Sequence, residues 1–83
     1  MVKSKKKYAL YLHNDDENAL SDVITIVMNV AGYDVTRASN IAYMAHRAGK
    51  YRFMTLDDRV SAKVTQAMFT RHGLTTEIET IYE

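Results

Sequence analysis

A run of short polar side chains follows the first apolar segment of the chain. Asn14, Asp15 and Asp16 come directly after Leu12 and His13, and no basic residue interrupts the run. Amide and carboxylate oxygens accept hydrogen bonds, and so does the free nitrogen of a neutral imidazole such as that of His46. These acceptors suit a ligand that brings its own N–H donors, and a free α-ammonium group is such a ligand.

The number of acceptors matches what an α-ammonium group needs. The group has three donors and an unperturbed pKa of about 7.7–8.0, so it is mostly charged at neutral pH. Asn14 Oδ1, the Asp16 carboxylate and a nitrogen of His46 would satisfy all three donors. Loss of one acceptor would leave a buried N–H unpaired, at a cost of about 1–3 kcal/mol or more. An acetylated terminus cannot present three donors, so the cluster predicts specificity for a free terminus.

This chemistry predicts a pH dependence for binding. Affinity should fall as the pH rises through the pKa of the ligand amine, because the third donor is lost. It should also fall on the acid side, because an imidazole gains a proton near pH 6.5, roughly its value in model peptides, and then loses its acceptor.

Hydrophobic spacing predicts the elements that position these residues. The segment Lys7–Leu12 is rich in apolar and aromatic residues, which predicts a strand. Two helices follow, capped by Asn18 and Asp34 and ended by Gly32 and Gly49. Their apolar residues recur at steps of three and four. The inner faces are Leu20, Val23, Ile24, Val27 and Ala31 in the first helix, and Val35, Ala38, Ile41, Ala42 and Ala45 in the second.

The two helices form a hairpin that explains how distant residues can meet. Both helices have similar lengths at about 1.5 Å per residue, so the second returns beside the first. We therefore expect His46 to lie at the level of Asn14–Asp16.

The second half of the chain completes a small sheet. Residues 51–56 predict a strand, and Asp57 or Asp58 can cap a third helix that ends at Gly73. Residues 75–81 predict a last strand with one polar face. The inner face of the third helix is expected to hold Val60, Val64, Ala67 and Met68. The order βααβαβ predicts an α+β two-layer sandwich with three helices on one face of a three-stranded antiparallel sheet.

Length and charge limit the classes of function. We expect one domain over residues 7–83 after a short flexible tail over residues 1–6. Eleven basic against ten acidic residues leave the chain almost neutral, which argues against a nucleic-acid binder. The N-terminus carries a cluster of lysines, namely Lys3, Lys5, Lys6 and Lys7. No apolar stretch approaches a membrane span, and the lack of cysteine favours a cytoplasmic protein without disulfides.

The Asn-Asp-Asp loop, His46 and the order of elements resemble the ClpS family over about Tyr8 to Glu79. The resemblance implies an adaptor without a cofactor, monomeric, that binds N-degrons and presents them to the N-terminal domain of a Clp AAA+ unfoldase of the ClpA or ClpC type. It implies that Asn14, Asp16 and His46 bind the α-amino group. Asp15 and Asn18 would support the loop.

The resemblance also implies an apolar pocket for the first side chain of the substrate. The matching positions are Leu12, Leu20, Val23, Ala42, Ala45 and Leu74. Leu20 stands where the family usually has Met, and Ala42 and Ala45 replace a Met and a Val. These smaller side chains should widen the pocket, so we expect it to take Phe, Tyr and Trp, with Leu filling it less well.

Delivery to the protease is a separate question. Asp58 and Lys63 match an acidic residue and a lysine with which the family docks on the unfoldase. The family uses a flexible N-terminal extension for delivery, and here this segment is short. The chain could therefore deliver substrates, or bind them and interfere with delivery.

Other classes of function remain as alternatives. A structural interaction module would resemble the C-terminal domain of the ribosomal stalk protein, which lacks the Asn-Asp-Asp and His constellation. Catalysis is not expected, because there is no cysteine and the serines have no recognisable base beside them. A metal site from His13, Asp15, Asp16 and His46 lacks close ligand spacing, and His13 should point to the opposite side of the strand from Leu12.

Overall fold

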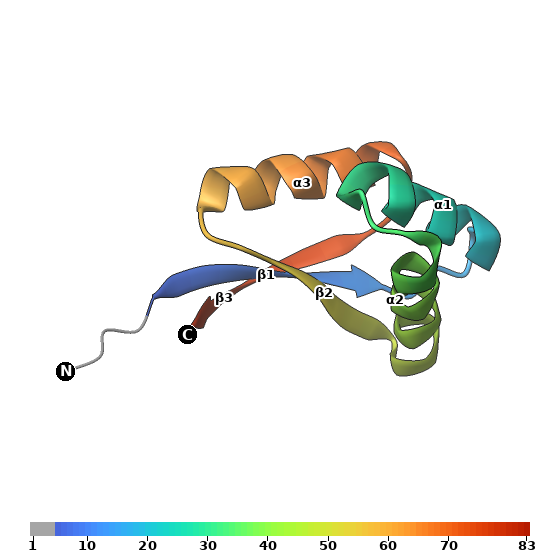
Figure 1. The fold of residues 1–83 in the computed structure, drawn as a ribbon, viewed down its shortest axis with the longest axis horizontal. Helices are drawn as coiled ribbons and strands as arrows, with labels where there is room; N and C mark the ends of the chain where they lie inside the picture. The colour runs from blue at the N-terminus through green and yellow to red at the C-terminus, as the bar shows by residue number, and fades with distance from the viewer. Residues whose placement is uncertain (1–4) are drawn as a thin grey trace.

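Six elements follow one another in the predicted order (Figure 1). The computed structural model describes residues 5–83. The elements are β1 (Lys6–His13), α1 (Leu20–Ala31), α2 (Val35–Ala48), β2 (Lys50–Leu56), α3 (Arg59–Arg71) and β3 (Thr76–Tyr82). The α+β class with three helices and a three-stranded antiparallel sheet is confirmed. None of these helices is both long enough and apolar enough to cross a membrane.

The first strand lies in the middle of the sheet. The strand order is β2-β1-β3, and both neighbours run antiparallel to β1. Leu10 and Leu12 point to the face that the helices cover, where they join Val27, Ala38 and Phe69 in one buried core. The loop after β1 therefore starts from the most constrained strand of the fold.

A β-bulge interrupts the pairing of β1 with β2. Leu10 pairs with Met54 and Tyr11 with Arg52, so Phe53 is the extra residue. The bulge allows the Phe53 ring to enter the core, where it meets the Phe69 ring edge to face at 5.3 Å between centroids.

The strand ladder begins earlier than predicted. β1 starts at Lys6, and the backbone N–H of Lys5 donates to the carbonyl of Glu83 at 2.7 Å. The last residues of the chain provide these partners, which is why local composition did not reveal them. Residues 1–4 of the expected tail lie outside the described residues.

Two of the predicted helix caps are present and one is not. Asp34 accepts from the backbone N–H of Arg37 at 2.8 Å, and Asp58 accepts from that of Ser61 at 3.2 Å. The prediction that Asn18 caps α1 is wrong, because Ala19 occupies the N-cap position without a side-chain hydrogen bond. The Asn18 amide is used elsewhere in the loop.

The predicted inner face of α3 is also wrong. The buried residues of this helix are Ala62 and Phe69, whereas Val60, Val64 and Met68 are 71%, 55% and 42% exposed, and Ala67 is exposed as well. This helix carries two apolar stripes, and only one of them can face the core. The stripe with the large Phe69 ring is buried against Phe53, and the other one then faces solvent.

Candidate functional site

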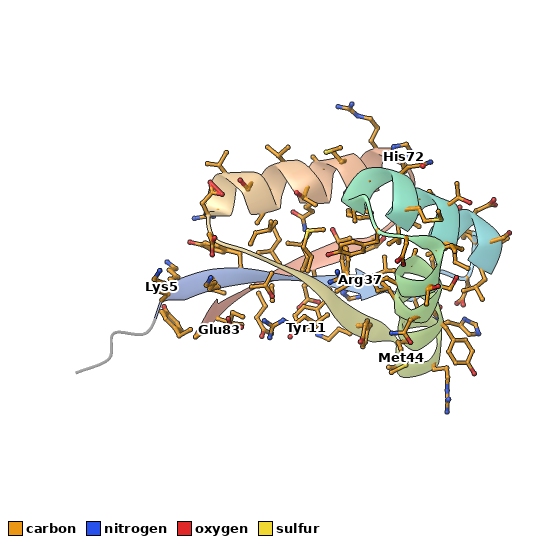
Figure 2. All side chains as sticks on the ribbon, in the orientation of Figure 1. Lys5, Tyr11, Arg37, Met44, His72 and Glu83 are labelled. Carbon is orange, nitrogen blue, oxygen red and sulfur yellow. The ribbon has the colours of Figure 1, made fainter. Side chains whose placement is uncertain are left out.

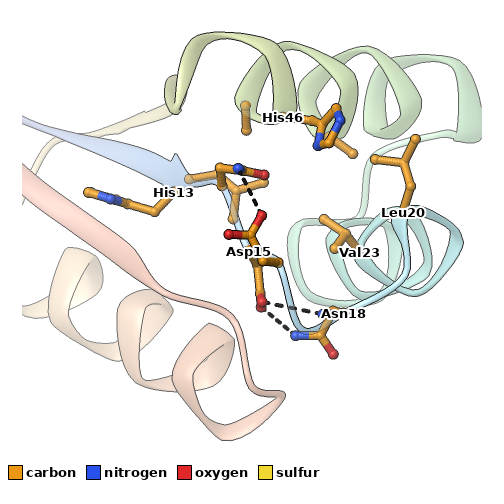
Figure 3. Close-up of a pocket in the computed structure, with 11 residues that line it drawn as sticks. His13, Asp15, Asn18, Leu20, Val23 and His46 are labelled. Carbon is orange, nitrogen blue, oxygen red and sulfur yellow. Dashed lines mark hydrogen bonds between the residues drawn. The ribbon is translucent and has the colours of Figure 1, made fainter.

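A hollow of about 210 Å³ opens where the loop after β1, the start of α1 and the end of α2 meet (Figure 3). Its lining residues come from all three segments. They are Leu12, His13, Asn14, Asp15, Asp16, Asn18, Leu20, Val23, Ala42, Ala45 and His46. The structure therefore brings together the three residues expected to bind an amine and all but one of those expected to form the apolar pocket.

The helical hairpin places His46 as the spacing predicted. Gly32 ends α1 with a φ of 75°, a conformation that glycine adopts without strain, and the chain reverses into α2. At the other end of α2, the backbone N–H of Asn14 donates to the carbonyl of Gly49 at 2.8 Å. A main-chain hydrogen bond thus links the Asn-Asp-Asp loop to the end of the helix that carries His46.

The side chains of Asn14 and Asp16 orient one another. The Asn14 amide nitrogen donates to Asp16 Oδ1 at 3.4 Å, which leaves the Asn14 carbonyl oxygen as an acceptor for a ligand. Within residues 5–83, no side-chain hydrogen bond occupies the ring of His46, which lines the same hollow. The hollow therefore has unused acceptors on two of its sides.

Asp15 is engaged within the loop. Its Oδ1 accepts from the backbone N–H groups of Glu17 at 2.7 Å and Asn18 at 3.3 Å, and its Oδ2 accepts from the Asn18 side chain. The hydrogen bond from the Asn18 side chain, followed by that from the Glu17 backbone, lowers the pKa of the Asp15 carboxyl. With both oxygens occupied, Asp15 holds the loop rather than a ligand.

The Asn18 amide links the loop to a third part of the fold. Besides Asp15, it donates to the carbonyl of Gly73, between α3 and β3, at 3.2 Å. This contact explains why Asn18 is not available as a cap for α1. Both members of the expected loop-support pair thus make the contacts that such a role requires.

His13 points away from the space that His46, Leu20 and Val23 enclose (Figure 3). Its Nε2 lies 2.8 Å from Glu77 Oε1 on β3. The hydrogen bond with His13 and the charge of Lys50 lower the pKa of Glu77. Within the described residues, no three His, Asp or Glu side chains are grouped in a way that could hold a metal ion.

The apolar wall comes from all three elements. Leu12, Val23, Ala42 and Ala45 are buried, whereas Leu20 at the start of α1 is 42% exposed. Leu74 does not line the hollow, although the resemblance placed it there. It is only 2% exposed and belongs to the core, and its backbone N–H donates to the carbonyl of Phe69 at 3.0 Å.

The residues expected to dock on an unfoldase lie elsewhere. Asp58 caps α3, and Lys63 lines a separate hollow with Lys6 and Arg59. The start of α3 and the start of α1 lie at opposite ends of the molecule (Figure 1). Two different surfaces therefore carry the two groups of predicted residues.

Two comparisons found a similarity, one with a solved structure and one with the sequence model of a family. No curated protein matches the chain in sequence. Among solved structures, that of Agrobacterium tumefaciens ClpS2 bound to L-phenylalaninamide matches with a TM-score of 0.70 and 21% identity, covering 94% of this chain and 98% of that one. The sequence model of the family described as ATP-dependent Clp protease adaptor protein ClpS matches residues 3–77. Because this match covers most of the 83 residues, the chain belongs to the ClpS family of Clp protease adaptors.

Proposed function

We propose that this protein binds the free α-amino group and the bulky apolar first side chain of N-degron substrates and presents them to a Clp AAA+ unfoldase. The observation that carries the proposal is that Asn14, Asp16 and His46 line one hollow together with buried apolar residues. Family membership supports the adaptor role.

The polar and apolar parts of the hollow have different tasks in this proposal. The α-ammonium group donates to Asn14 Oδ1, to the Asp16 carboxylate and to a nitrogen of His46. Charge-assisted hydrogen bonds of this kind are stronger than neutral ones. The first side chain enters the apolar wall, and a buried aromatic side chain removes about 150–250 Å² of surface from water. Both parts must be filled for tight binding.

The alanines on α2 support a preference for large side chains. Ala42 and Ala45 each contribute only a methyl group to the wall. Apolar burial is worth roughly 25 cal/mol per Å², so Phe, Tyr and Trp gain more than Leu from a wide pocket. The aromatic ligand in the Agrobacterium ClpS2 structure is in keeping with this preference.

A fluorescence titration tests the amine-binding role. We expect a peptide with N-terminal Phe to bind, and its acetylated twin to lose most of the affinity, because acetylation removes the charge and two of the three donors. Equal binding of both peptides would contradict the proposal.

A competition series with N-terminal Phe, Tyr, Trp, Leu, Ile and Val then tests the pocket. Equal affinity for all six peptides, or a preference for Val, would reject the size argument.

We propose further that the unfoldase docks on α3. The partner would be the N-terminal domain of a ClpA-type or ClpC-type unfoldase. Asp58 and Lys63 are on this helix, and the exposed Val60, Val64 and Met68 provide apolar contact area beside them. Exposed apolar residues that lie together often mark a protein interface.

Binding to the isolated unfoldase domain tests the docking face. We expect Lys63→Glu to weaken this interaction while leaving the affinity for the Phe peptide unchanged. Lys50→Glu, at an exposed lysine away from α3, is the control.

A degradation assay with a fluorescent N-degron substrate then separates the two possible outcomes of docking. Faster degradation indicates delivery, and slower degradation in the presence of a second, delivering adaptor indicates interference.

A further inference from the structure

A second hollow, of about 410 Å³, lies between the start of α2 and the free edge of β2. It is lined by Tyr33, Arg37, Arg52, Phe53, Met54 and Thr55. Two of these residues are arginines and none is acidic. None of them lines the hollow that contains Asn14 and His46.

The Arg37 side chain is held in place without using its hydrogen-bond donors. Its guanidinium carbon lies 3.9 Å from the centre of the Tyr33 ring, and the Tyr33 hydroxyl donates to the carbonyl of Phe53 at 3.2 Å. Stacking of this kind uses the flat face of the guanidinium group and leaves its N–H edge available. Within residues 5–83, no carboxylate forms an ion pair with Arg37. Figure 2 shows Arg37 extending from α2 over the sheet.

Arg52 is held by a neighbour that the bulge brings to its side. Residues three apart on a regular strand point to opposite faces, but the extra residue Phe53 puts Arg52 and Thr55 on the same face. Arg52 Nε and Nη2 donate to Thr55 Oγ1 at 3.3 and 2.8 Å, and Nη2 also donates to Glu83 at 2.8 Å. Arg52 thus already forms an ion pair with the Glu83 carboxylate, and within residues 5–83 no hydrogen bond uses its Nη1 group.

We infer that this hollow is a binding site for a carboxylate. A guanidinium group matches the two oxygens of a carboxylate in a planar, bidentate geometry. Because both arginine side chains are already held, a ligand does not have to order them, which lowers the entropic cost of binding. A dicarboxylate should bind more tightly than a monocarboxylate, since two arginines line the hollow. The inference does not depend on the proposed N-degron site.

An NMR titration of the full chain with sodium succinate, at constant ionic strength, tests this inference. We expect saturable shifts of the Arg37 and Arg52 Nε–H signals and of the Thr55 amide, and weaker shifts with acetate. Arg37→Gln should weaken succinate binding by about tenfold, because one charge-assisted contact is lost. An acetylated, amidated peptide with a single Glu shows whether a protein carboxylate binds as well as a free acid does.

Arg47→Gln is the matched control. Arg47 lies on the same helix and stacks at 5.7 Å on Tyr43, but it does not line the hollow. An equal loss of affinity in this variant would overturn the inference, and so would shifts that grow linearly without saturation. Either result would be explained by nonspecific charge effects of succinate on the whole protein surface. Binding of inorganic phosphate without binding of succinate would overturn the assignment to a carboxylate.

A second variant keeps the test informative if Arg37→Gln affects folding. Thr55→Ala removes the acceptor that orients Arg52 and leaves α2 unchanged. We expect weaker succinate binding with an otherwise unaltered spectrum and an unchanged affinity for the Phe peptide. Unchanged succinate binding would show that Arg52 is not a ligand.

Discussion

At the scale of single residues, Asn14 and Asp16 differ from Asp15 in the hydrogen-bond acceptors that they leave unused. Asn14 and Asp16 contact each other through one amide hydrogen only, so acceptors remain for a ligand. Asp15, between them in sequence, uses both of its oxygens inside the loop. Adjacent residues of similar chemistry thus have different roles because their surroundings differ.

Truncation of the amine-binding residues should weaken binding strongly. We expect His46→Ala and Asn14→Ala each to cost about 1–3 kcal/mol in affinity for the Phe peptide, because an N–H of the ligand is left unpaired. His72→Ala is a matched control, since this exposed histidine is at the end of α3. Fluorescence titration measures all three variants. A loss in the control as large as that in His46→Ala would remove the assignment.

The lowered pKa of Asp15 predicts the pH range in which the loop loses stability. The carboxyl has a lower pKa in the folded state than in the unfolded chain, so the folded state favours the charged form. Its contribution to stability is therefore complete above the unfolded value of about 3.9 and is lost as the pH falls through the folded value. Asp15→Asn should reduce the unfolding temperature at pH 7, and the difference from wild type should shrink as the pH falls below the unfolded value of about 3.9. A difference that stays constant from pH 7 to pH 2 would contradict this explanation.

Because Asp15 stays charged above that range, the pH profile of binding between pH 5 and 9 reports on other groups. We expect affinity for the Phe peptide to fall above pH 8, as the ligand amine, with a pKa of about 7.7–8.0, loses its proton. A flat profile measured by fluorescence titration would exclude the ammonium model.

At the scale of elements, α2 sets the width of the pocket. Ala42 is buried in the wall, so a longer side chain there must occupy space that a ligand would use. We expect Ala42→Met to reduce the affinity for N-terminal Trp more than for N-terminal Leu, by roughly tenfold if overpacking costs 1–3 kcal/mol. Ala48→Met, at an exposed position of the same helix, is the control. Competition binding that shows equal losses for Trp and Leu would contradict the role of α2.

The two apolar stripes of α3 should differ greatly in their effect on stability. Phe69 is fully buried against Phe53, so Phe69→Ala should cost about 3–5 kcal/mol in the free energy of unfolding. Val64 is 55% exposed, and Val64→Thr should change this free energy by less than about 0.5 kcal/mol. Urea unfolding measures both variants. A large loss with Val64→Thr would mean that the outer stripe is covered by another part of the chain.

Local patterns predicted the elements better than they predicted their contacts. The order of elements and the caps Asp34 and Asp58 follow from hydrophobic spacing and cap chemistry, which act over a few residues. The orientation of α3 depended on Phe53, a residue of another element that a bulge turns into the core. The role of Asn18 depended on Gly73, which is far away in sequence.

The positions of the site residues were also largely predictable, because they follow from local patterns. The hairpin converts helix lengths into a position for His46, and this geometry needs no knowledge of distant contacts. The exception was Leu74, whose place in the core is determined by packing against the end of α3. The arginine hollow at β2 could not be predicted, since it requires the bulge that places Thr55 beside Arg52.

At the scale of the whole molecule, the proposed substrate site and the proposed docking face are separate. The hollow with Asn14 and His46 lies at one end, and the start of α3 lies at the other (Figure 1). A small domain of this shape can hold a substrate and a partner without the two overlapping. The free-energy changes caused by mutations at such distant positions are expected to be independent of one another.

This separation predicts that the two activities can be removed independently. Asn14→Ala should weaken binding of the Phe peptide by about 1–3 kcal/mol and leave docking on the unfoldase domain intact, and Lys63→Glu should weaken docking and leave peptide binding intact. The double variant should show each of the two losses at the size seen in the corresponding single variant, within about 0.5 kcal/mol. Surface plasmon resonance with each partner immobilised measures these effects. A loss of both activities in either single variant would indicate one shared surface.

The main-chain bond between Asn14 and Gly49 has a consequence for the history of such adaptors. Backbone atoms, which any sequence provides, hold the Asn-Asp-Asp loop against the end of α2, whereas the wall of the hollow consists of exchangeable side chains such as Ala42 and Ala45. Under the proposed function, related chains can therefore differ in the first amino acid that they select and still distinguish a free chain terminus from an internal residue.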